Sequence, residues 1–482
     1  MPGRGRPRKT AAESPRDGPA ADGTPEKGPG AKEPGSTKLR SCRKTEERSG
    51  GSAENESPAK ERKKTLSKKK DTQAPVSSKP TCAGAQNQLA STTENSTEET
   101  RALRNPPKKS SSLEHSPNKL LRETLENLKI KKIHRSEATK CVNDIQEAVT
   151  RHVSKNLHWC KDIKVLRTGS HYENVKICDS DEFDVMMAVS VERVDIQPFG
   201  DDGAFYSVAM KRHQTHVLDK FLNDDKTIRA SEMLQEFRES VKEVTNKLPY
   251  EVTVERKKPG CPAVTLKVMQ DKVISLDFVL GLEVHSSSWP SFTVDGFKID
   301  KWLGKTVKTE QKRKPYYLVS KYEGSGQREL DGVIAKDAWR ISFSHVEKFI
   351  LKNHGLSKTC CETRPTCCRK QCLKLLKYLV QRLKEKYPKE AAKLCSYHAK
   401  TTLLHSCASR VEDSEWATDQ LSHCFQQLLH DFEEHLRRYQ LPNFFIPSHN
   451  LLKSAGLDNK TCILLANHIE FQRNNNFPLF DE

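Results

Sequence analysis

Residues 169–184 read GSHYENVKICDSDEFD, a stretch that joins a small-residue turn to a pair of alternating acids. The residues that follow, VMMAV, continue it as a predicted β-strand. Because successive side chains of a strand alternate between its two faces, we expect Glu182 and Asp184 on the same face. Paired carboxylates can hold hard divalent cations such as Mg2+, which share their oxygen ligands with substrate phosphates.

Two further features extend this pattern to a candidate site for metal ions and a nucleotide. Gly169 and Ser170 follow the apolar residues 165–166; glycine lets backbone N–H groups approach an anion, and the hydroxyl adds a donor. The apolar run VISLDFVL at 273–280 predicts a buried strand that Asp277 interrupts. A buried unpaired carboxylate is costly, so Asp277 is the candidate third metal ligand.

Each part of this series also has an ordinary structural explanation. A Gly-Ser pair is common in turns, and Glu182 and Asp184 could form a solvated strand edge. Asp277 could be held in the core by a salt bridge or by hydrogen bonds. Only the ordered series as a whole makes a metal site as good an explanation as these alternatives.

The composition indicates a protein with a polyanionic partner. The length of 482 residues suits about two to three domains. The formal net charge of +18 points most simply to nucleic acid as the partner. A basic tail on an ordinary domain is the alternative. No apolar run approaches the ~20 residues that span a membrane, and the N-terminus has no signal-peptide pattern. We therefore expect an intracellular protein whose fifteen cysteines do not form a disulfide framework.

Residues 1–118 have the composition of a disordered segment. The first aromatic residue of the chain is Trp159, and Pro, Gly, Ser, Lys and Arg dominate the tail. Such a segment cannot bury enough apolar surface to offset its ordering entropy. Its basic runs at 4–9, 62–64 and 68–70 could bind phosphate backbones without reading sequence, or serve as nuclear-localisation signals.

Hydrophobic periodicity predicts the order of the remaining elements. Apolar residues between Leu121 and Val153 recur at helical spacing and predict one long helix, or two with a break near 133–136. A basic cluster on it, at 129–135, could contact nucleic acid or simply form a solvated helix face. A helix is predicted over 231–248 with Ser231 as its N-cap. Further strands are predicted at 205–210, 251–255, 263–268 and 273–280.

The pattern becomes helical from about residue 342. Helices are predicted at 343–351, 372–387, 399–407, 419–439 and 459–471. The sequence therefore predicts an α/β lobe with a mixed central sheet, followed by an α-helical lobe, with a cleft between the two.

Residues 354–368 read HGLSKTCCETRPTCC and combine one imidazole with several thiols. These ligand types and spacings suit a tetrahedral Zn2+ ion. If four side chains bind the metal, no position is left for water, so we expect a structural site that holds a loop. Free cysteines near the start of a helix are the alternative.

From about residue 120 to 482, the sequence resembles the cyclic GMP-AMP synthases, a family of Mab-type nucleotidyltransferases. The resemblance is carried by T-G-S-x-Y-E-x-V-K-I, E-F-D-V-M, S-L-D-F, W-R-x-S-F-S-H-V-E-K, H-x5-C-C, C-R-K-x-C-L-K-L-x-K-Y-L, S-Y-H and F-I-P. It implies a nucleotidyltransferase lobe with a mixed central β-sheet, then a C-terminal α-helical lobe with a zinc thumb, preceded by a disordered basic tail. The implied boundaries are tail 1–118, long DNA-binding helix 119–160, catalytic lobe 161–340 and helical lobe 341–482.

The resemblance also implies roles for residues of the active site. The catalytic acids, which would hold two Mg2+ or Mn2+ ions, are Glu182, Asp184 and Asp277. The nucleotide-binding residues are Gly169 and Ser170 on the triphosphate, Arg340 on guanine, Lys377 and Ser396 on the donor phosphates, and Tyr397 stacked on a base. Val279 stands where the mammalian enzymes have a threonine near the guanine base, so base preference could differ.

One structural Zn2+ ion is implied for the thumb, on His354, Cys360, Cys361 and Cys367. The family has six residues between the cysteine pair and the last ligand, but here five separate Cys361 from Cys367. Counting from the cysteine pair would choose Cys368, whereas matching the following R-K-x-C-L-K-L chooses Cys367, which we prefer.

The resemblance further implies binding of double-stranded DNA regardless of its sequence. The DNA-binding residues would be Lys129, Lys132, Lys348, Lys358, Lys370 and Lys374. Lys358 and Glu362 would also lie in the contact of a homodimer on DNA. Arg193 and Arg212 resemble, more weakly, a pair that docks on the nucleosome.

The implied activity is DNA-dependent synthesis of cyclic GMP-AMP from ATP and GTP by two Mg-dependent phosphoryl transfers. The family acts in the cytosol and nucleus as an innate immune DNA sensor upstream of STING. An oligoadenylate synthetase activated by double-stranded RNA would use the same acids and a basic groove, but the zinc thumb is not part of that family's pattern. A non-enzymatic tether would tolerate loss of the acids, so the presence of all three favours an enzyme.

Overall fold

The computed structural model describes residues 117–179, 181–211, 217–322, 324–355, 361 and 367–481. The predicted disordered tail, apart from its last residues, lies outside these ranges. In the part of the chain that is described, the cysteines form no disulfide bonds.

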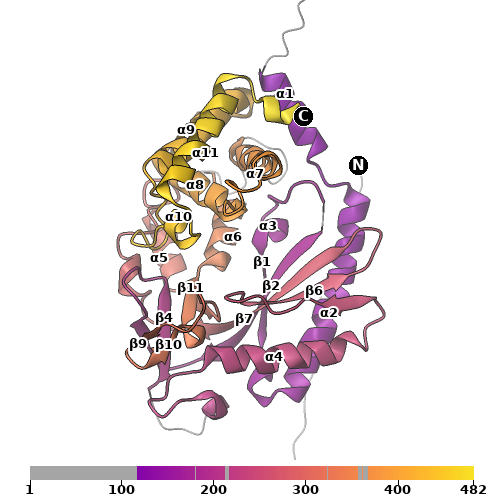
Figure 1. The fold of residues 1–482 in the computed structure, drawn as a ribbon, viewed down its shortest axis with the longest axis vertical. Helices are drawn as coiled ribbons and strands as arrows, with labels where there is room; N and C mark the ends of the chain where they lie inside the picture. The colour runs from indigo at the N-terminus through magenta and orange to yellow at the C-terminus, as the bar shows by residue number, and fades with distance from the viewer. Residues whose placement is uncertain are drawn as a thin grey trace, which may run out of the picture. The chain divides into compact units, whose positions relative to one another are not determined.

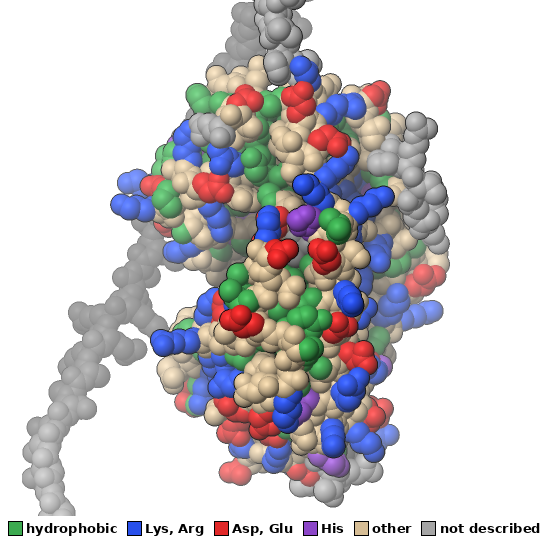
Figure 2. Space-filling view, turned by 90° about the vertical axis from the view of Figure 1, so that its right-hand side faces the viewer, with side chains coloured by type: hydrophobic (Ala, Val, Ile, Leu, Met, Phe, Trp, Pro, Cys, Tyr) green, Lys and Arg blue, Asp and Glu red, His purple; other side chains and the backbone are tan. Residues whose placement is uncertain are grey.

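Two helices open the described chain, α1 (Pro117–Asn127) and α2 (Lys132–Asn156). The break between them lies at 128–131, so its predicted position near 133–136 is wrong. The reason is tertiary: buried Leu128 accepts a hydrogen bond from the backbone N–H of Cys178 at 3.3 Å, which fixes the chain where it leaves α1. Figure 2 views the side on which α2 lies in Figure 1 and shows many Lys and Arg side chains, interspersed with acids.

A mixed sheet forms the centre of the catalytic lobe, as predicted (Figure 1). Its order is β1-β2-β7-β8-β11-β4-β3, with β6 on β7 and β5 on β6. Parallel β2 pairs along one edge of β7, while antiparallel β6 and β8 share the other edge. The bounds are β1 (Lys164–Thr168), β2 (Glu182–Val191), β3 (Val194–Pro198), β4 (Phe205–Met210), β5 (Val252–Val254), β6 (Ala263–Val268), β7 (Ile274–Val284), β8 (Tyr316–Val319) and β11 (Trp339–Ser342). A separate ribbon pairs β9 (Glu329–Leu330) with β10 (Val333–Ile334).

Helix α4 (Ala230–Thr245) corrects one sequence prediction, because Ser231 is not its N-cap. Arg229 occupies that position without a side-chain cap, and Ser231 lies in the first turn. There, both the backbone N–H of Ser231, at 3.0 Å, and its hydroxyl donate to the carboxylate of Asp337. The carboxylate of Asp337, from a distant segment, therefore accepts a hydrogen bond from a free N–H group of the first turn, which was the predicted role of the Ser231 side chain.

The helical lobe follows the sheet, as predicted. Its helices are α6 (Ser344–Lys352), α7 (Arg369–Lys386), α8 (Ser396–Ser409), α9 (Leu421–Arg437), the short α10 (Leu451–Ser454) and α11 (Asn459–Asn474). Helix α5 (Lys305–Lys312) precedes them, between β7 and β8. Helix α9 packs on α11, α7 and α8 through apolar residues spaced by one turn, such as Phe425, Leu428 and Phe432.

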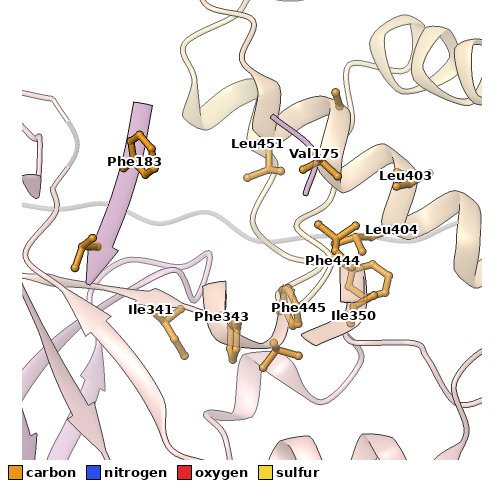
Figure 3. Packing of buried hydrophobic residues seen from close by; sticks show 14 of the residues in the cluster. Val175, Phe183, Ile341, Phe343, Ile350, Leu403, Leu404, Phe444, Phe445 and Leu451 are labelled. Atoms are coloured by element: carbon orange, nitrogen blue, oxygen red, sulfur yellow. The ribbon is translucent and has the colours of Figure 1, made fainter. Parts of the chain in front are cut away.

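An aromatic cluster joins the two lobes (Figure 3). Phe343, directly after β11, stacks on Phe445 of the helical lobe with ring centroids 4.5 Å apart. Phe297 also stacks on Phe445, with ring centroids 5.3 Å apart, and its backbone N–H donates to the carbonyl of Phe444 at 2.7 Å. A Cβ atom on Gly296 would overlap the carbonyl of Phe445, so the backbones meet at closest approach. This close packing holds the walls of the cleft in register.

Candidate active site

The three acids singled out in the sequence lie on neighbouring strands of the sheet. Asp184 of β2 is directly opposite Asp277 of β7 in the parallel register. Glu182 is two residues before Asp184 and shares its face, while Phe183 between them is buried in the main core. Met186 and Val279 form an apolar floor on the same face. The structure therefore brings Glu182, Asp184 and Asp277 together at one end of the parallel strand pair.

Burial and neighbouring charges shift the pKa values of these acids. Burial, together with the charges of Glu182 and Asp277, raises the pKa of Asp184 to about 7. Burial also raises the pKa of Asp277, against a 2.6 Å hydrogen bond from Thr265 that lowers it. For Glu182, burial would raise the pKa, but Lys176, 2.8 Å away, lowers it below its usual range. An all-oxygen cluster that is costly to ionise fits hard divalent cations.

Gly169 brings the backbone directly against these acids. It begins the one-turn helix α3 (Gly169–Tyr172) immediately after β1, with a φ of 79° that favours glycine. A Cβ atom at this position would overlap the Asp184 carboxylate. The position therefore requires glycine for two independent reasons, and it places Ser170 at the same cavity.

A cavity of about 300 Å3 lies over Glu182 and Asp184 and is lined by both lobes. From the helical side it receives Lys377 of α7 and Ser396, Tyr397 and Lys400 of α8. Burial, with the nearby charges of Lys176 and Lys400, lowers the pKa of Lys377 to about 8. These groups provide the cationic wall that a polyphosphate requires.

Ser396 is the first residue of α8, and a reciprocal cap explains why the helix begins there. The Cys395 side chain accepts the N–H of His398, and His398 Nδ1 accepts the N–H of Cys395 at 3.2 Å. The sequence placed this start at residue 399. Because the cap lies at the cavity, the first free N–H groups of the helix and its positive dipole end lie beside Ser396.

A second cavity of about 420 Å3 adjoins the first. Both are bordered by Tyr397 and Glu347, and the second also contains Arg340 of β11. Two compartments that meet at an aromatic side chain can hold two planar ligands next to one acid cluster.

Sequence reasoning missed a buried charge network behind these cavities. Lys400 Nζ lies 2.9 Å from Glu173 and 3.0 Å from Glu347, and Glu347 also accepts from the Tyr397 hydroxyl at 2.9 Å. Glu173 and Glu347 both fall inside motifs quoted above. However, a sequence pattern cannot predict that Glu173 and Glu347, 174 residues apart, both pair with Lys400. Only the fold brings α3, α6 and α8 together.

The comparison with known proteins agrees with this architecture. The Mab-21 protein nucleotidyltransferase domain matches residues 171–353, and the Mab-21 HhH/H2TH-like domain matches 368–471. Cyclic GMP-AMP synthase from Mus musculus is 42% identical over 365 residues, covering 75% of this chain and 70% of the relative. The Sus scrofa protein is 43% identical over 366 residues, covering 75% and 72%.

The chain belongs to the cyclic GMP-AMP synthase family. A cyclic GMP-AMP synthase-like receptor from Magallana gigas is more distant, 25% identical over 323 residues, with 61% of this chain and 48% of the relative covered. Membership in the cyclic GMP-AMP synthase family makes the chain a nucleotidyltransferase enzyme, as the resemblance predicted. None of the helices in the described ranges has the length and apolarity needed to cross a membrane.

In this cyclic GMP-AMP synthase family member, the thumb brings His354, Cys361 and Cys367 together. Their ligand atoms lie within 4.8 Å of one another, and the two sulfurs are 3.7 Å apart. A hydrogen bond with Cys367, against burial, lowers the pKa of Cys361, which favours the thiolate that metals bind. Cys368 instead meets Cys372, with sulfurs 3.8 Å apart. Cys360 lies outside the described residues.

The predicted DNA-binding lysines form two groups. In the first group, burial and the nearby charges of Lys370, Arg135 and Lys129 lower the pKa of Lys374. Lys129 is exposed and paired with Glu126, and Lys132 at the start of α2 is also exposed.

The second group surrounds Lys348 on α6. Its ammonium donates to the carbonyl of Arg167 at 2.6 Å, and burial with the charges of Lys352 and Arg167 lowers its pKa. Arg193 is exposed in the turn between β2 and β3. The other predicted contacts, Lys358, Glu362 and Arg212, lie outside the described residues.

Proposed function

We propose that the chain makes cyclic GMP-AMP from ATP and GTP when double-stranded DNA binds to it, as an innate immune DNA sensor upstream of STING. The observation that carries the proposal is the acid cluster of Glu182, Asp184 and Asp277 beside two adjoining cavities of about 300 and 420 Å3. One active centre with room for two nucleotides suits the joining of two different nucleotides and the closing of a ring.

The acids would hold two Mg2+ ions, which when bound lower the pKa of a ribose hydroxyl and neutralise the leaving pyrophosphate. Asp277 takes the proton of that hydroxyl, a role that suits a carboxylate whose pKa is raised. The hydroxyl oxygen then bonds to the α-phosphorus of the other nucleotide, and the bond to pyrophosphate breaks. A second transfer of the same kind closes the ring.

The remaining residues of the cleft position the substrates. Backbone N–H groups at Gly169 and the hydroxyl of Ser170 bind the triphosphate of the donor. Lys377 neutralises its phosphates from the helical side, and Ser396, the first residue of α8, donates a hydrogen bond to them at the positive end of the helix dipole. Tyr397 stacks on a base, and Arg340 in the second cavity contacts guanine.

For the partners, we propose contacts between DNA phosphates and both lysine groups, with Lys358 adding a contact from the thumb. A homodimer on DNA would use Lys358 and Glu362, and Arg193 with Arg212 would dock on nucleosomes. His354, Cys360, Cys361 and Cys367 would bind one structural Zn2+ ion. The proposed locations are the cytosol and the nucleus.

The test is mass spectrometry of the products formed from ATP, GTP and Mg2+ with long double-stranded DNA, with double-stranded RNA, or with neither. A cyclic GMP-AMP peak that requires DNA supports the proposal. Adenylate ladders with RNA would instead indicate an oligoadenylate synthetase, and no product under any condition would favour a tether.

Two variants make this test specific to the acid cluster. Asp277→Asn removes one carboxylate charge at nearly constant shape and should abolish the product. Asp162→Asn makes the same change at an exposed position outside the cleft and should leave the yield unchanged. Equal yields from the two variants would contradict the assignment of the acids.

A further inference from the structure

One buried imidazole in the second cavity has no role in the scheme above. His449 lies between α9 and α10, with a side chain only 1% exposed. Its backbone N–H donates to Ile446 at 3.0 Å, and its carbonyl accepts from the N–H of Asn443 at 2.8 Å. The side chain is anchored as well, because Nδ1 lies 2.6 Å from a carboxylate oxygen of Asp202. Backbone hydrogen bonds therefore hold the main chain of His449, and Asp202 holds the ring at Nδ1.

The other ring nitrogen of His449 is left for a ligand. Nε2 is buried and has no hydrogen-bond partner among the residues that the structure describes. The residue lines the cavity of about 420 Å3 together with Arg340 and Tyr397. Since buried polar atoms are nearly always satisfied, an unpaired nitrogen at the wall of a substrate cavity indicates a contact made when the cavity is filled.

Asp202 determines what kind of contact this is. Burial would raise the pKa of Asp202, but hydrogen bonds from His449 and Ala204 and the charge of Arg340 lower it below its usual range. An ionised carboxylate only accepts hydrogen bonds, so Nδ1 is the nitrogen that carries the proton, and in a neutral ring Nε2 then presents a lone pair. Arg340, in contrast, can only donate. The cavity thus combines a fixed donor with a fixed acceptor.

Resting on the function proposed above, we propose that His449 Nε2 accepts a hydrogen bond from an N–H group of the purine base in the Arg340 cavity and so selects that base. Guanine matches the pair: its O6 and N7 atoms accept hydrogen bonds, and its N1–H and 2-amino groups donate them. Adenine offers fewer donors, and inosine lacks the 2-amino group. A buried acceptor rejects a base that leaves it unpaired.

The experiment measures base preference by competition. Wild type receives DNA, Mg2+, ATP and an equimolar mixture of GTP and ITP, and mass spectrometry gives the ratio of the products that contain guanine to those that contain hypoxanthine. A parallel reaction contains equimolar GTP and ATP without ITP, and it gives the ratio of incorporated GTP to ATP at the same position. His449→Phe keeps a ring and removes the acceptor, and we expect it to lower the preference for GTP by about 10- to 100-fold. His423→Phe, the same change at an exposed site on α9, should leave the preference unchanged.

A second variant acts through the proton position and does not alter the imidazole. In Asp202→Asn, the amide can donate to Nδ1, which moves the ring proton to Nε2 and turns the acceptor into a donor. This variant should lose the same preference. Because a ratio does not depend on the fraction of active enzyme, partial unfolding of either variant does not imitate the result.

The outcomes separate this inference from the proposed function. A lower GTP/ITP ratio in both variants assigns the contact to the 2-amino group, and a lower GTP/ATP ratio alone assigns it to N1–H. Unchanged ratios in both variants overturn the inference while the enzyme remains a cyclic GMP-AMP synthase. If wild type forms no product, the function fails, and equilibrium binding of GTP, ITP and ATP to wild type and His449→Phe decides the inference by itself.

Discussion

At the scale of single residues, Asp184 is the acid whose surroundings most constrain its charge. It is buried beside Glu182 and Asp277, and its pKa rises from 3.8 to about 7 without a bound cation. Repulsion among the ionised carboxylates lowers the free energy of unfolding of the metal-free protein, and bound cations remove this repulsion. The arrangement that binds metal therefore destabilises the fold in the absence of metal.

This cost predicts a pH dependence of stability. A carboxyl group with a raised folded-state pKa stabilises the protein below its unfolded pKa, and this contribution is lost as pH rises through the folded value. In magnesium-free buffer, the free energy of unfolding should fall by roughly 3–5 kcal/mol more in wild type than in Asp184→Asn between pH 4 and pH 8. Urea unfolding at each pH measures it, and parallel profiles would contradict the raised pKa. Added Mg2+ should recover stability in wild type only.

Gly169 supports a second expectation at this scale. Gly169→Ala combines a left-handed backbone with an overlap on Asp184, so we expect a loss of about 1–2 kcal/mol of stability and of at least ~100-fold in turnover. Gly332→Ala is the matched control, since its φ of 78° is nearly the same but no atom lies within 4 Å of the added Cβ. It should lose comparable stability and keep its turnover. Comparable turnover in the two variants would mean that the overlap has no catalytic consequence.

At the scale of elements, helix α8 carries both substrate contacts and the buried charge that ties the lobes together. Lys400 lies one turn after Tyr397 and forms ion pairs with Glu173, the residue directly after α3, and with Glu347 on α6. Its ammonium is the charge that offsets two buried carboxylates. The helix therefore positions its substrate residues through an ion cluster as well as through its cap.

Lys400→Met should consequently be strongly destabilising. Removal of the cation leaves two carboxylates buried together, which costs about 3–5 kcal/mol in comparable buried pairs. Lys155→Met, the same change at an exposed position on α2, should stay within about 0.5 kcal/mol of wild type. Chemical unfolding of both variants provides the comparison. A loss in Lys400→Met no larger than in Lys155→Met would show that the carboxylates are neutral or solvated.

The thumb gives an expectation that separates neighbouring cysteines. Cys367→Ser should lower bound zinc from about one to near zero per chain, because Cys367 lies with His354 and Cys361. Cys368→Ser should retain the metal, since that sulfur lies against Cys372. Elemental analysis of the purified variants measures the content. Loss of zinc from Cys368→Ser alone would reverse the choice between the two.

What the sequence predicted at this scale follows from local periodicity. The strand at 205–210 and the buried strands carrying Asp184 and Asp277 were correct, because alternation and apolar runs report on their own environment. The start of α4, the break after α1 and the start of α8 were misplaced. Each depends on a partner that pattern rules do not include: Asp337 for Ser231, Cys178 for Leu128, and a cysteine–histidine cap before Ser396.

At the scale of the whole molecule, positive charge from different elements gathers at common places. Lys374 of α7 lies near Arg135 of α2 although 239 residues separate them in sequence, and burial together with the charges of Lys370 and Arg135 lowers the pKa of Lys374. Such self-repulsion is tolerated where a polyanion relieves it. The net charge can be counted from the sequence, but only the fold assembles these groups.

Removal of one of these charges should therefore affect DNA binding and stability in opposite directions. We expect Lys374→Ala to weaken DNA binding and to reduce the slope of log Kobs against log salt by about one, while the unfolding free energy stays level or rises. Lys155→Ala, at an exposed site on α2, serves as the control. Fluorescence anisotropy over a salt series measures the slope. An unchanged slope would remove Lys374 from the DNA surface.

The stacked rings of Phe343, Phe297 and Phe445 have a consequence for how such an enzyme is switched on. A swing of one lobe against the other would have to separate these stacked rings and the backbones that meet at Gly296. The element next to the acids is short by comparison, since α3 is a single turn that begins at a glycine with positive φ. Activation through such a turn requires a conformational change of only a few peptide units, while the packing of the rest of the molecule stays the same.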